Sequence, residues 1–329
     1  MTAFFASVSV LSLWALVLGG CEVTDCKTEE GKDATCAESL KVHEGESQSE
    51  SVPYAVGQNV TIQGIYGDIF VTGGDEAEVA AIFKPFNYRG HDQDVEAERE
   101  LAENLDLAVV SDADGITISA SRHDAANGLG SHITVALPPE FNGVLFVQND
   151  GDGPINQGNI DVSYVGEATT LNVVNHGLEN CNILRPEGRD DELLEASTLT
   201  DTDVRCGADI YVRGVSDNVY VDSRDPAFHS DVVVEIMSIS ANATGGEIKG
   251  ADSDVRVFFP DAGDYSISAS AGDNGAHIGT VVAGSCEETG SDETSAELTC
   301  GAGGPVYQVF ANDADPDDES SFVDVRVEL

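Results

Sequence analysis

The chain has 329 residues, of which 60 are acidic and 15 basic, so its formal net charge is −45. This charge repels nucleic acid, which excludes nucleic-acid binding as a function, and the length suffices for one large domain or two small ones. The acidic residues are spread along the whole chain and lysine is scarce. That pattern is more typical of adaptation to a salty medium than of a cation-binding surface, the alternative interpretation.

The chain begins with an apolar segment, residues 4–18, that ends in Leu18-Gly19-Gly20-Cys21. About 15 apolar residues are too few to span a bilayer comfortably and are typical of a secretory signal. The tetrapeptide resembles the lipobox of bacterial lipoproteins. The resemblance implies removal of residues 1–20 and lipidation of the Cys21 thiol. A buried N-terminal helix, or an ordinary signal with an accidental cysteine, is the alternative, and the lack of Lys and Arg in residues 1–20 counts against a normal signal.

Residues 21–53 are polar and show no sustained apolar period, so they are predicted to form a tether between the membrane and a folded domain. Order is expected to begin near Tyr54. The predicted organisation is therefore a signal peptide over 1–20, a polar tether over 21–53 and one acidic β domain over 54–329.

Setting Cys21 aside leaves an even number of cysteines beyond a signal peptide, which indicates an oxidising compartment and a disulfide framework. The six remaining cysteines fall into three couples that are close in sequence, and a disulfide within each couple closes a short loop and contributes about 2–4 kcal/mol of stability. Zinc binding is disfavoured because no C-x-x-C or H-x-x-x-H spacing occurs. The three predicted disulfides are Cys26–Cys36, Cys181–Cys206 and Cys286–Cys300.

Short runs in which apolar and polar residues alternate fill the chain after Tyr54, separated by Gly, Asp and Asn. Such period-2 alternation with β-branched residues predicts β-strands, and hence an all-β fold. The runs are 60–62, 69–71, 116–118, 133–135, 145–147, 160–162, 171–173, 210–212, 219–221, 232–234, 239–241, 255–257, 267–269 and 323–325.

The spacing of these strands, roughly 7 to 15 residues, suits either a stacked solenoid or a sandwich. Residues 67–71, 158–162 and 208–212 look like one unit written three times, which favours a parallel β-solenoid or β-helix. In such a unit the apolar side chains point into a narrow core while glycine and asparagine occupy the corners. A β-sandwich is the alternative fold.

Two longer stretches also match each other. Residues 131–138 followed by 144–147 align with 253–260 followed by 266–269. Each is predicted to form a strand that ends in proline, a second strand and a turn rich in Gly and Asp.

One surface helix is predicted to interrupt the strands, over residues 92–105. Its apolar stripe is thin, consisting of Val95, Leu101 and Leu105, and its remaining face is acidic and solvated. The helix is expected to lead into a β-hairpin over residues 107–118.

Residues 60–329 resemble the putative-adhesin domain of bacterial envelope proteins. The matching features are an Ile-x-Gly-x-x-Gly-Asp-Ile-x-Val pattern over 62–71, a charged helix before Asp-Gly115, and V-x-V-x-x-P strand ends at Pro138 and Pro260. The resemblance implies a β-solenoid-like fold and a cell-surface setting, and it implies no catalytic residues.

Enzyme signatures are missing from the sequence: there is no nucleophile elbow, Walker loop or dinucleotide fingerprint. A carbohydrate-active β-helix enzyme, a lyase or glycosidase, is the alternative, since it needs only two carboxylates across a groove. Carboxylates are too plentiful to nominate a pair, and the only tryptophan, Trp14, lies in the predicted signal. The histidines are scattered and are predicted to be structural: His43, His91, His123, His132, His176, His229 and His277.

Calcium is the one cofactor that the sequence suggests. Oxygen ligands occur at positions 1, 3, 5, 7 and 12 of an EF-hand-like loop, although Asp318 replaces the glycine of the sixth position and strands replace the flanking helices. A solvated acidic loop is the alternative. The candidate ligands are Asp313, Asp315, Asp317, Glu319 and Asp324.

The sequence as a whole predicts a lipid-anchored protein of the cell envelope, at the outer membrane or cell surface, and not an enzyme. Its β-solenoid is expected to serve adhesion or structural contacts. The expected partners are the membrane, through the anchor, and envelope proteins or surface polymers. A periplasmic component that binds an envelope-assembly partner is a third hypothesis.

Overall fold

The computed structural model describes residues 26–27, 35–36, 40–90, 93–123, 128–150, 158–168, 170–177, 179–185, 199–214, 217–224, 229–272, 277–282, 284–291, 294–312 and 322–327. These residues form 26 strands and one helix, so the prediction of an all-β fold is confirmed. The predicted signal peptide and Cys21 lie outside the described residues.

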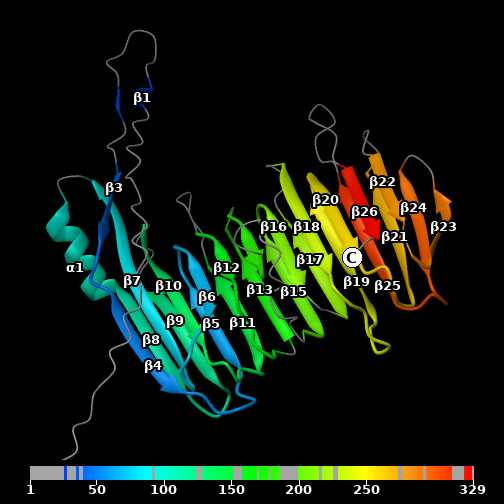
Figure 1. Cartoon of the computed structure of the whole chain (residues 1–329). Helices are drawn as coiled ribbons and strands as arrows, with labels where there is room; N and C mark the ends of the chain where they lie inside the picture. The colour runs from blue at the N-terminus through cyan, green and yellow to red at the C-terminus, as the bar shows by residue number, and fades with distance from the viewer. Residues whose placement is uncertain are drawn as a thin grey trace, which may run out of the picture.

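Two sheets of twelve strands each contain almost all of the strands (Figure 1). In spatial order, sheet I contains β22 (His277–Val282), β26 (Phe322–Val327), β20 (Ser253–Phe259), β18 (Ser230–Ile236), β16 (Ile210–Gly214), β14 (Cys181–Ile183), β12 (Ile160–Val162), β6 (Ile69–Gly73), β10 (Leu129–Leu137), β7 (Glu78–Gly90) and β3 (Leu40–Glu44), and β4 (Gln48–Pro53) also pairs with β7.

Sheet II has its own order of strands, and a separate two-stranded sheet joins β1 (Cys26–Lys27) to β2 (Thr35–Cys36). In spatial order, sheet II contains β23 (Cys286–Ser291), β24 (Ser295–Cys300), β21 (Tyr265–Ala271), β25 (Val306–Asn312), β19 (Gly245–Ala251), β17 (Asn218–Ser223), β15 (Asp201–Cys206), β13 (Thr170–Asn175), β11 (Val144–Asn149), β5 (Val60–Gly64), β9 (Ile116–Arg122) and β8 (Leu105–Ser111).

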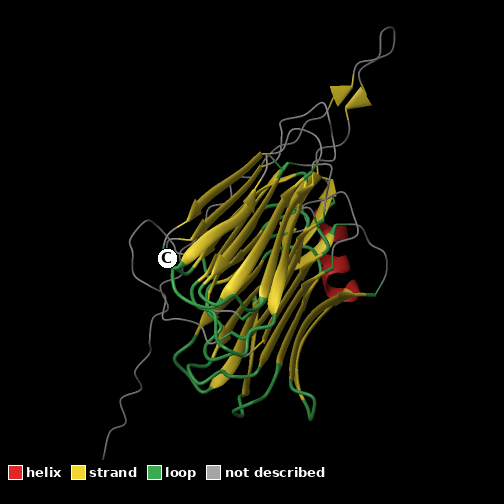
Figure 2. Cartoon of the chain, turned by 90° about the vertical axis from the view of Figure 1, so that its right-hand side faces the viewer, coloured by secondary structure: helices red, strands yellow, loops and turns green. Residues whose placement is uncertain are grey.

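Successive strands from β10 to β22 alternate between the two sheets. Within each sheet they pair in parallel, for example β11 with β13 and β12 with β14. The inward side chains of both sheets form one apolar core. Figure 2 shows the strands turned by 90°, with the helix to one side.

The core is built from side chains that lie in register on neighbouring strands. One such row in sheet I consists of side chains that are at most 1% exposed: Ile69, Ile160, Cys181, Ile210, Val232, Val255 and Val323. Full burial of a branched aliphatic side chain stabilises a fold by about 1.5–3 kcal/mol. The period-2 alternation read from the sequence therefore becomes a continuous stack of side chains from strand to strand.

Asx side chains occupy the residue before each of several sheet I strands. Each side-chain oxygen accepts the backbone N–H of the equivalent residue on the next strand, at 2.9 to 3.1 Å. These bonds satisfy corner amides that the strand ladder does not reach. The predicted corner residues were Gly and Asn, whereas three of the five residues here are Asp, and the last of them, the second residue of β18, contributes only its backbone N–H. We call these residues the corner ladder: Asp68, Asn159, Asn180, Asp209 and Asp231.

Glycine is required at one of these corners. Gly158 has a φ of +84°, and a Cβ there would lie 2.1 Å from the carbonyl of Gly67. Only glycine allows the two backbones to approach so closely.

The tether prediction was wrong for its last part, because residues 40–44 and 48–53 form β3 and β4. Both strands pair antiparallel with β7, so the sheet begins before Tyr54. No residue of β4 is buried. A strand held mainly by its backbone shows no apolar alternation, which is why the sequence did not reveal it.

The predicted helix is present as α1 (Asp94–Asn104), and the hairpin that follows it consists of β8 and β9. The predicted apolar stripe was wrong in part: Val95 is 81% exposed and Ala97 is the buried helical residue. Hydrogen bonds from Arg89 and Asn87 to Glu100 attach the helix to β7. We call these hydrogen bonds among Asn87, Arg89 and Glu100 the polar clamp, and they take the place of the contact expected from Val95.

Each copy of the duplicated unit forms one strand in sheet I followed by one strand in sheet II: β10 and then β11 in the first copy, β20 and then β21 in the second. The run at 239–241 is not a strand, contrary to the prediction. The Asp217 carboxylate binds Ser240 through its backbone N–H and its hydroxyl, which holds the segment as a loop. No helix among the described residues is long and apolar enough to cross a membrane.

Candidate functional site

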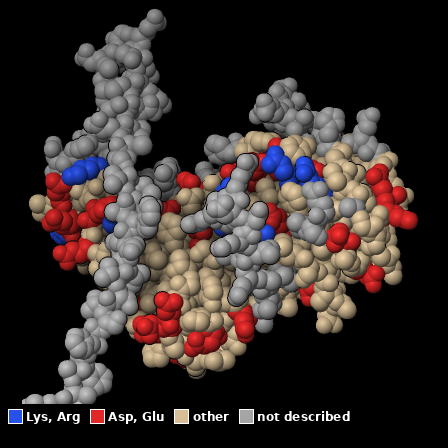
Figure 3. All heavy atoms as spheres, viewed as in Figure 1, with Lys and Arg blue, Asp and Glu red and all other residues tan. Residues whose placement is uncertain are grey.

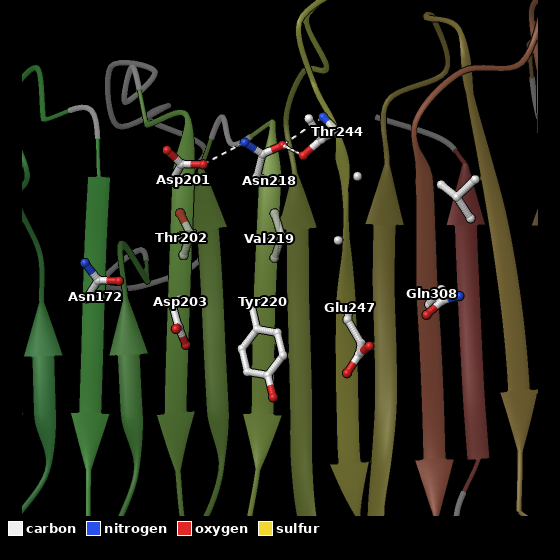
Figure 4. A pocket seen from close by; sticks show the side chains of 13 residues that line it. Asn172, Asp201, Thr202, Asp203, Asn218, Val219, Tyr220, Thr244, Glu247 and Gln308 are labelled. Atoms are coloured by element: carbon white, nitrogen blue, oxygen red, sulfur yellow. Dashed lines mark hydrogen bonds between the residues drawn. The ribbon is translucent and has the colours of Figure 1, made fainter.

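A shallow groove of about 490 Å³ runs over β13, β15, β17, β19 and β25 on the outer face of sheet II (Figure 4). Most of its lining side chains are polar. The lining residues are Asn172, Asp201, Thr202, Asp203, Asn218, Val219, Tyr220, Thr244, Gly245, Gly246, Glu247, Val306 and Gln308.

Two glycines at the start of β19 leave the hollow. A Cβ on Gly245, whose φ is +102°, would lie 2.1 Å from the carbonyl oxygen of Val306. A Cβ on Gly246 would lie equally close to the carbonyl oxygen of Val219. Because both residues lack a side chain, the start of β19 packs tightly between its neighbouring strands, and no side chain projects from it into the groove.

Asn218 holds one rim of the groove together. Its amide nitrogen donates to Asp201 at 2.6 Å, and its amide oxygen accepts hydrogen bonds from the backbone N–H and hydroxyl of Thr244 at 2.8 and 2.7 Å (Figure 4). This amide thus links three consecutive strands of sheet II, β15, β17 and the end that leads into β19.

The floor of the groove is one register row of polar side chains, which we call the polar row. It runs through Asn172, Asp203, Tyr220, Glu247 and Gln308. Adjacent strands lie about 4.8 Å apart, so five strands make the row about 19 Å long. Each residue projects from a different strand, which spaces the polar groups evenly.

Cations from the next row pair with both carboxylates of the polar row. Arg205 donates to the two oxygens of Asp203 at 2.8 and 2.7 Å, and Lys249 forms an ion pair with Glu247. These hydrogen bonds raise the pKa of Arg205 and the pKa of Lys249 above their ordinary values. On the floor of the groove, each of these two carboxylates is therefore balanced by a cation. Elsewhere on the face of the molecule shown in Figure 3, acidic side chains outnumber basic ones.

Tyr220 is the aromatic centre of the row. The Arg205 guanidinium lies 4.9 Å from its ring centroid, within cation–π range. This contact and a hydrogen bond of 3.5 Å that the phenol hydroxyl donates to Asp222 orient the ring on the surface of β17.

Each of the two carboxylates in the polar row is held by a cation on its own strand, Asp203 by Arg205 and Glu247 by Lys249. Asp203 and Glu247 lie two strands apart, about 9.6 Å between backbones, which is near the carboxyl separation of inverting glycosidases. A glycosidase also needs one carboxyl that delivers a proton to its substrate. Here Arg205 and Lys249 already occupy the two carboxylates.

Two of the three predicted disulfides are confirmed. Cys181–Cys206 joins β14 to β15 and so links sheet I to sheet II, whereas Cys286–Cys300 joins the neighbouring strands β23 and β24. The backbone of β1 and β2 sets Cys26 opposite Cys36, but the side chains of both lie outside the described residues, so that disulfide stays a prediction.

Four of the predicted calcium ligands, Asp313, Asp315, Asp317 and Glu319, lie outside the described residues. The fifth, Asp324, is on β26, where Arg326 donates to its carboxylate at 2.9 Å. Calcium would have to compete with this guanidinium for Asp324. Among the described side chains, no group of three or more candidate metal ligands comes together. The calcium site stays a prediction.

Of the predicted structural histidines, His132 contacts the corner ladder at Asp68. Its Nδ1 accepts the backbone N–H of Asp68 at 3.0 Å and lies 3.1 Å from the Asp68 carboxylate. Burial alone would raise the pKa of Asp68, but the adjacent His132 ring and hydrogen bonds from the backbone N–H and side-chain amide of Asn159 bring that pKa below its usual value. His132 thus supports the fold at sheet I, away from the groove.

Sequence reasoning missed the groove. The local signal that the sequence offers is the Gly245-Gly246 pair at the start of β19. The polar row is not visible in the sequence, because its members come from five strands spread over residues 172–308.

The fold and groove define an all-β protein of two large parallel-rich sheets with a polar groove on one outer face. No protein-family model matches the chain, and comparison with curated proteins finds no match. Among solved structures, a "putative adhesin" from Bacteroides fragilis is similar at 13% identity and a TM-score of 0.39, covering 86% of this chain and 97% of its own.

Two further structures are similar. One is a "putative cell adhesion protein" from Clostridium sporogenes, at 9% identity and a TM-score of 0.34, covering 86% of this chain and 100% of its own. The other is a "putative adhesin" from Parabacteroides distasonis, at 9% identity and a TM-score of 0.33, covering 85% and 97%.

Proposed function

We propose that this chain is a non-catalytic, lipid-anchored protein of the cell envelope, whose groove on sheet II is the contact surface for adhesive or structural interactions. The observation that carries the proposal is the polar row, in which Asp203 and Glu247 flank Tyr220 and are both ion-paired within the protein. Such a row offers hydrogen bonds and an aromatic ring to a partner without a free acid or base.

The regular alternation of parallel strands between the sheets supports a β-solenoid as the architecture of this protein. A solenoid presents long flat rows of side chains on its outer faces. The polar row is one of these, and the backbone ladder on both sides of each strand holds it rigid.

The lipobox-like Leu18-Gly19-Gly20-Cys21 supports the lipid anchor, and two disulfides fit an oxidising, extracytoplasmic compartment. Mass spectrometry of the mature N-terminus tests the anchor. We expect a diacylglyceryl modification on Cys21, and its loss with release of soluble protein in Cys21→Ser. An unmodified Cys21 in soluble protein would exclude the anchor.

The contact surface is tested by filling the groove. Val306 lies on its wall and is 47% exposed, so Val306→Trp adds bulk without disturbing the core. Val281 on β22, in sheet I, is 45% exposed and provides a matched control, Val281→Trp. We expect beads coated with the full chain to bind envelope material, with binding reduced by Val306→Trp only.

Two outcomes would contradict the proposal. Equal binding by the wild type and Val306→Trp would remove the groove as the contact surface. Release of reducing ends from glycans incubated with the protein would show catalysis and would favour the alternative, a carbohydrate-active enzyme.

A further inference from the structure

We infer that the groove binds an uncharged polysaccharide segment, roughly four sugar units long, laid across the strands of sheet II. The inference rests on the proposed function of the groove and adds the chemical class of its ligand. Three properties of the groove lead to it: its length, its hydrogen-bonding groups and its charge.

The length suits a short oligosaccharide. The polar row extends about 19 Å across five strands, with one polar side chain every 4.8 Å or so. A pyranose ring is about as wide as one such step. Successive sugar units can therefore each meet the side chains of one or two strands, and the regular strand spacing matches the regular repeat of a polymer.

The hydrogen-bonding groups suit hydroxyls. Amides at both ends of the row, Asn172 and Gln308, donate and accept, whereas Asp203 and Glu247 accept only and the Tyr220 hydroxyl, which donates to Asp222, can still accept. A sugar hydroxyl is a donor and an acceptor in one group, so it can pair with every member of this series. The Tyr220 ring adds an apolar surface for the C–H face of one sugar.

The charge of the groove disfavours an anionic ligand, and its carboxylates already have partners within the protein. Among the described residues that line it, none is Lys, Arg or His, and Arg205 and Lys249 in the next row are engaged by Asp203 and Glu247. A uronic acid polymer would meet three lining carboxylates and a molecule of net charge −45. A cationic peptide would find Asp203 and Glu247 already paired, and Asp201 bonded to the neutral amide of Asn218.

The polar row is also held in place before any ligand arrives. Its backbone lies in continuous parallel ladders, and Arg205 fixes both Asp203 and Tyr220. Little conformational entropy is lost on binding to side chains that are already ordered.

The test titrates the purified full chain in detergent with tetrasaccharides of glucose, mannose, xylose and N-acetylglucosamine, and with tetragalacturonate and tetralysine, by calorimetry. We expect at least one uncharged tetrasaccharide to bind, with its affinity lowered about tenfold or more by Tyr220→Ala and little changed in Tyr211→Ala. Tyr211 is a matched control because it also lies under an arginine, Arg185, but on sheet I.

The outcomes separate this inference from the proposed function. If Val306→Trp reduces binding of envelope material but no uncharged tetrasaccharide binds, the contact surface stands and the glycan inference fails. Stronger binding of tetragalacturonate or of tetralysine overturns the inference in favour of an anionic glycan or a cationic peptide. Equal affinity of wild type and Tyr220→Ala for the same tetrasaccharide places its site elsewhere and also overturns it.

Discussion

The backbone N–H of Asn159 donates a hydrogen bond of 2.9 Å to a carboxylate oxygen of Asp68, a residue 91 positions earlier in the chain. The same relationship then repeats along sheet I, through Asn180 and Asp209 to Asp231. One side chain per strand thus closes the corner of the next strand, which joins segments distant in sequence.

The corner ladder should be most sensitive to substitution at its middle. In Asn180→Ala the N–H of Asp209 loses its acceptor, and we expect the free energy of unfolding to fall by about 1–2 kcal/mol. Asn180→Asp keeps an acceptor and should cost less. Urea denaturation measures both, with Asn242→Ala at an exposed turn as the control. An effect of Asn180→Ala no larger than the control would show that the ladder adds no stability.

The Asp68 carboxylate should contribute stability that depends on pH. Its pKa in the folded protein is lowered from 3.8, so the ionised form is favoured by folding. The contribution is therefore complete well above pH 3.8 and is lost as pH falls through the lower, folded pKa. We expect the melting temperature of wild type to exceed that of Asp68→Asn at neutral pH, with the difference shrinking in acid.

Many carboxylates titrate in the same range, so only the difference between these two proteins is informative. His132→Gln serves as a second variant, because it removes the imidazole that lies 3.1 Å from the Asp68 carboxylate and leaves Asn159 in place. A difference between wild type and Asp68→Asn that stays constant from pH 7 to acid would contradict the prediction.

The disulfide Cys181–Cys206 should stabilise the middle of the molecule. It closes a loop of 25 residues and joins the two sheets, and in the chain-entropy model such a loop is worth about 3 kcal/mol. The double variant Cys181→Ala/Cys206→Ala should lose about this much in chemical denaturation. The matched comparison, Cys286→Ala/Cys300→Ala, opens a loop of 14 residues between neighbouring strands and should lose less. The reverse order of stabilities would contradict the prediction.

The polar clamp should hold α1 on β7. Glu100 accepts hydrogen bonds from Arg89 at 2.7 and 2.6 Å and from the fully buried Asn87 at 2.7 Å. Glu100→Ala leaves the Asn87 amide without this acceptor, at a cost of about 1–3 kcal/mol. We expect faster amide hydrogen exchange in α1 and little change in sheet II. Glu98→Ala, at an exposed position of the same helix, is the control and should leave exchange unchanged.

The sequence by itself determined the strands whose side chains alternate over a buried face. At Ile160-Asp161-Val162, for example, Ile160 and Val162 are fully buried and Asp161 is half-buried, as the alternation predicted. Asparagine was predicted at the corners before such strands, where Asn159 and Asn180 lie, and the local cysteine pairs at 181/206 and 286/300 were correct. In each case neighbouring residues carry the whole signal, because strand geometry and short loops are local properties.

Only the tertiary structure decided which strands lie side by side. In sheet II, β25 inserts between β19 and β21, so that Glu247 lies beside Gln308 although about 60 residues separate them in the chain. In sheet I, β3 and β4 pair with β7 through backbone hydrogen bonds that no side-chain pattern reveals. The polar row around Tyr220 follows from that pairing. Register between distant strands depends on how the whole core packs, so a row of side chains drawn from five strands exists only once the chain has folded.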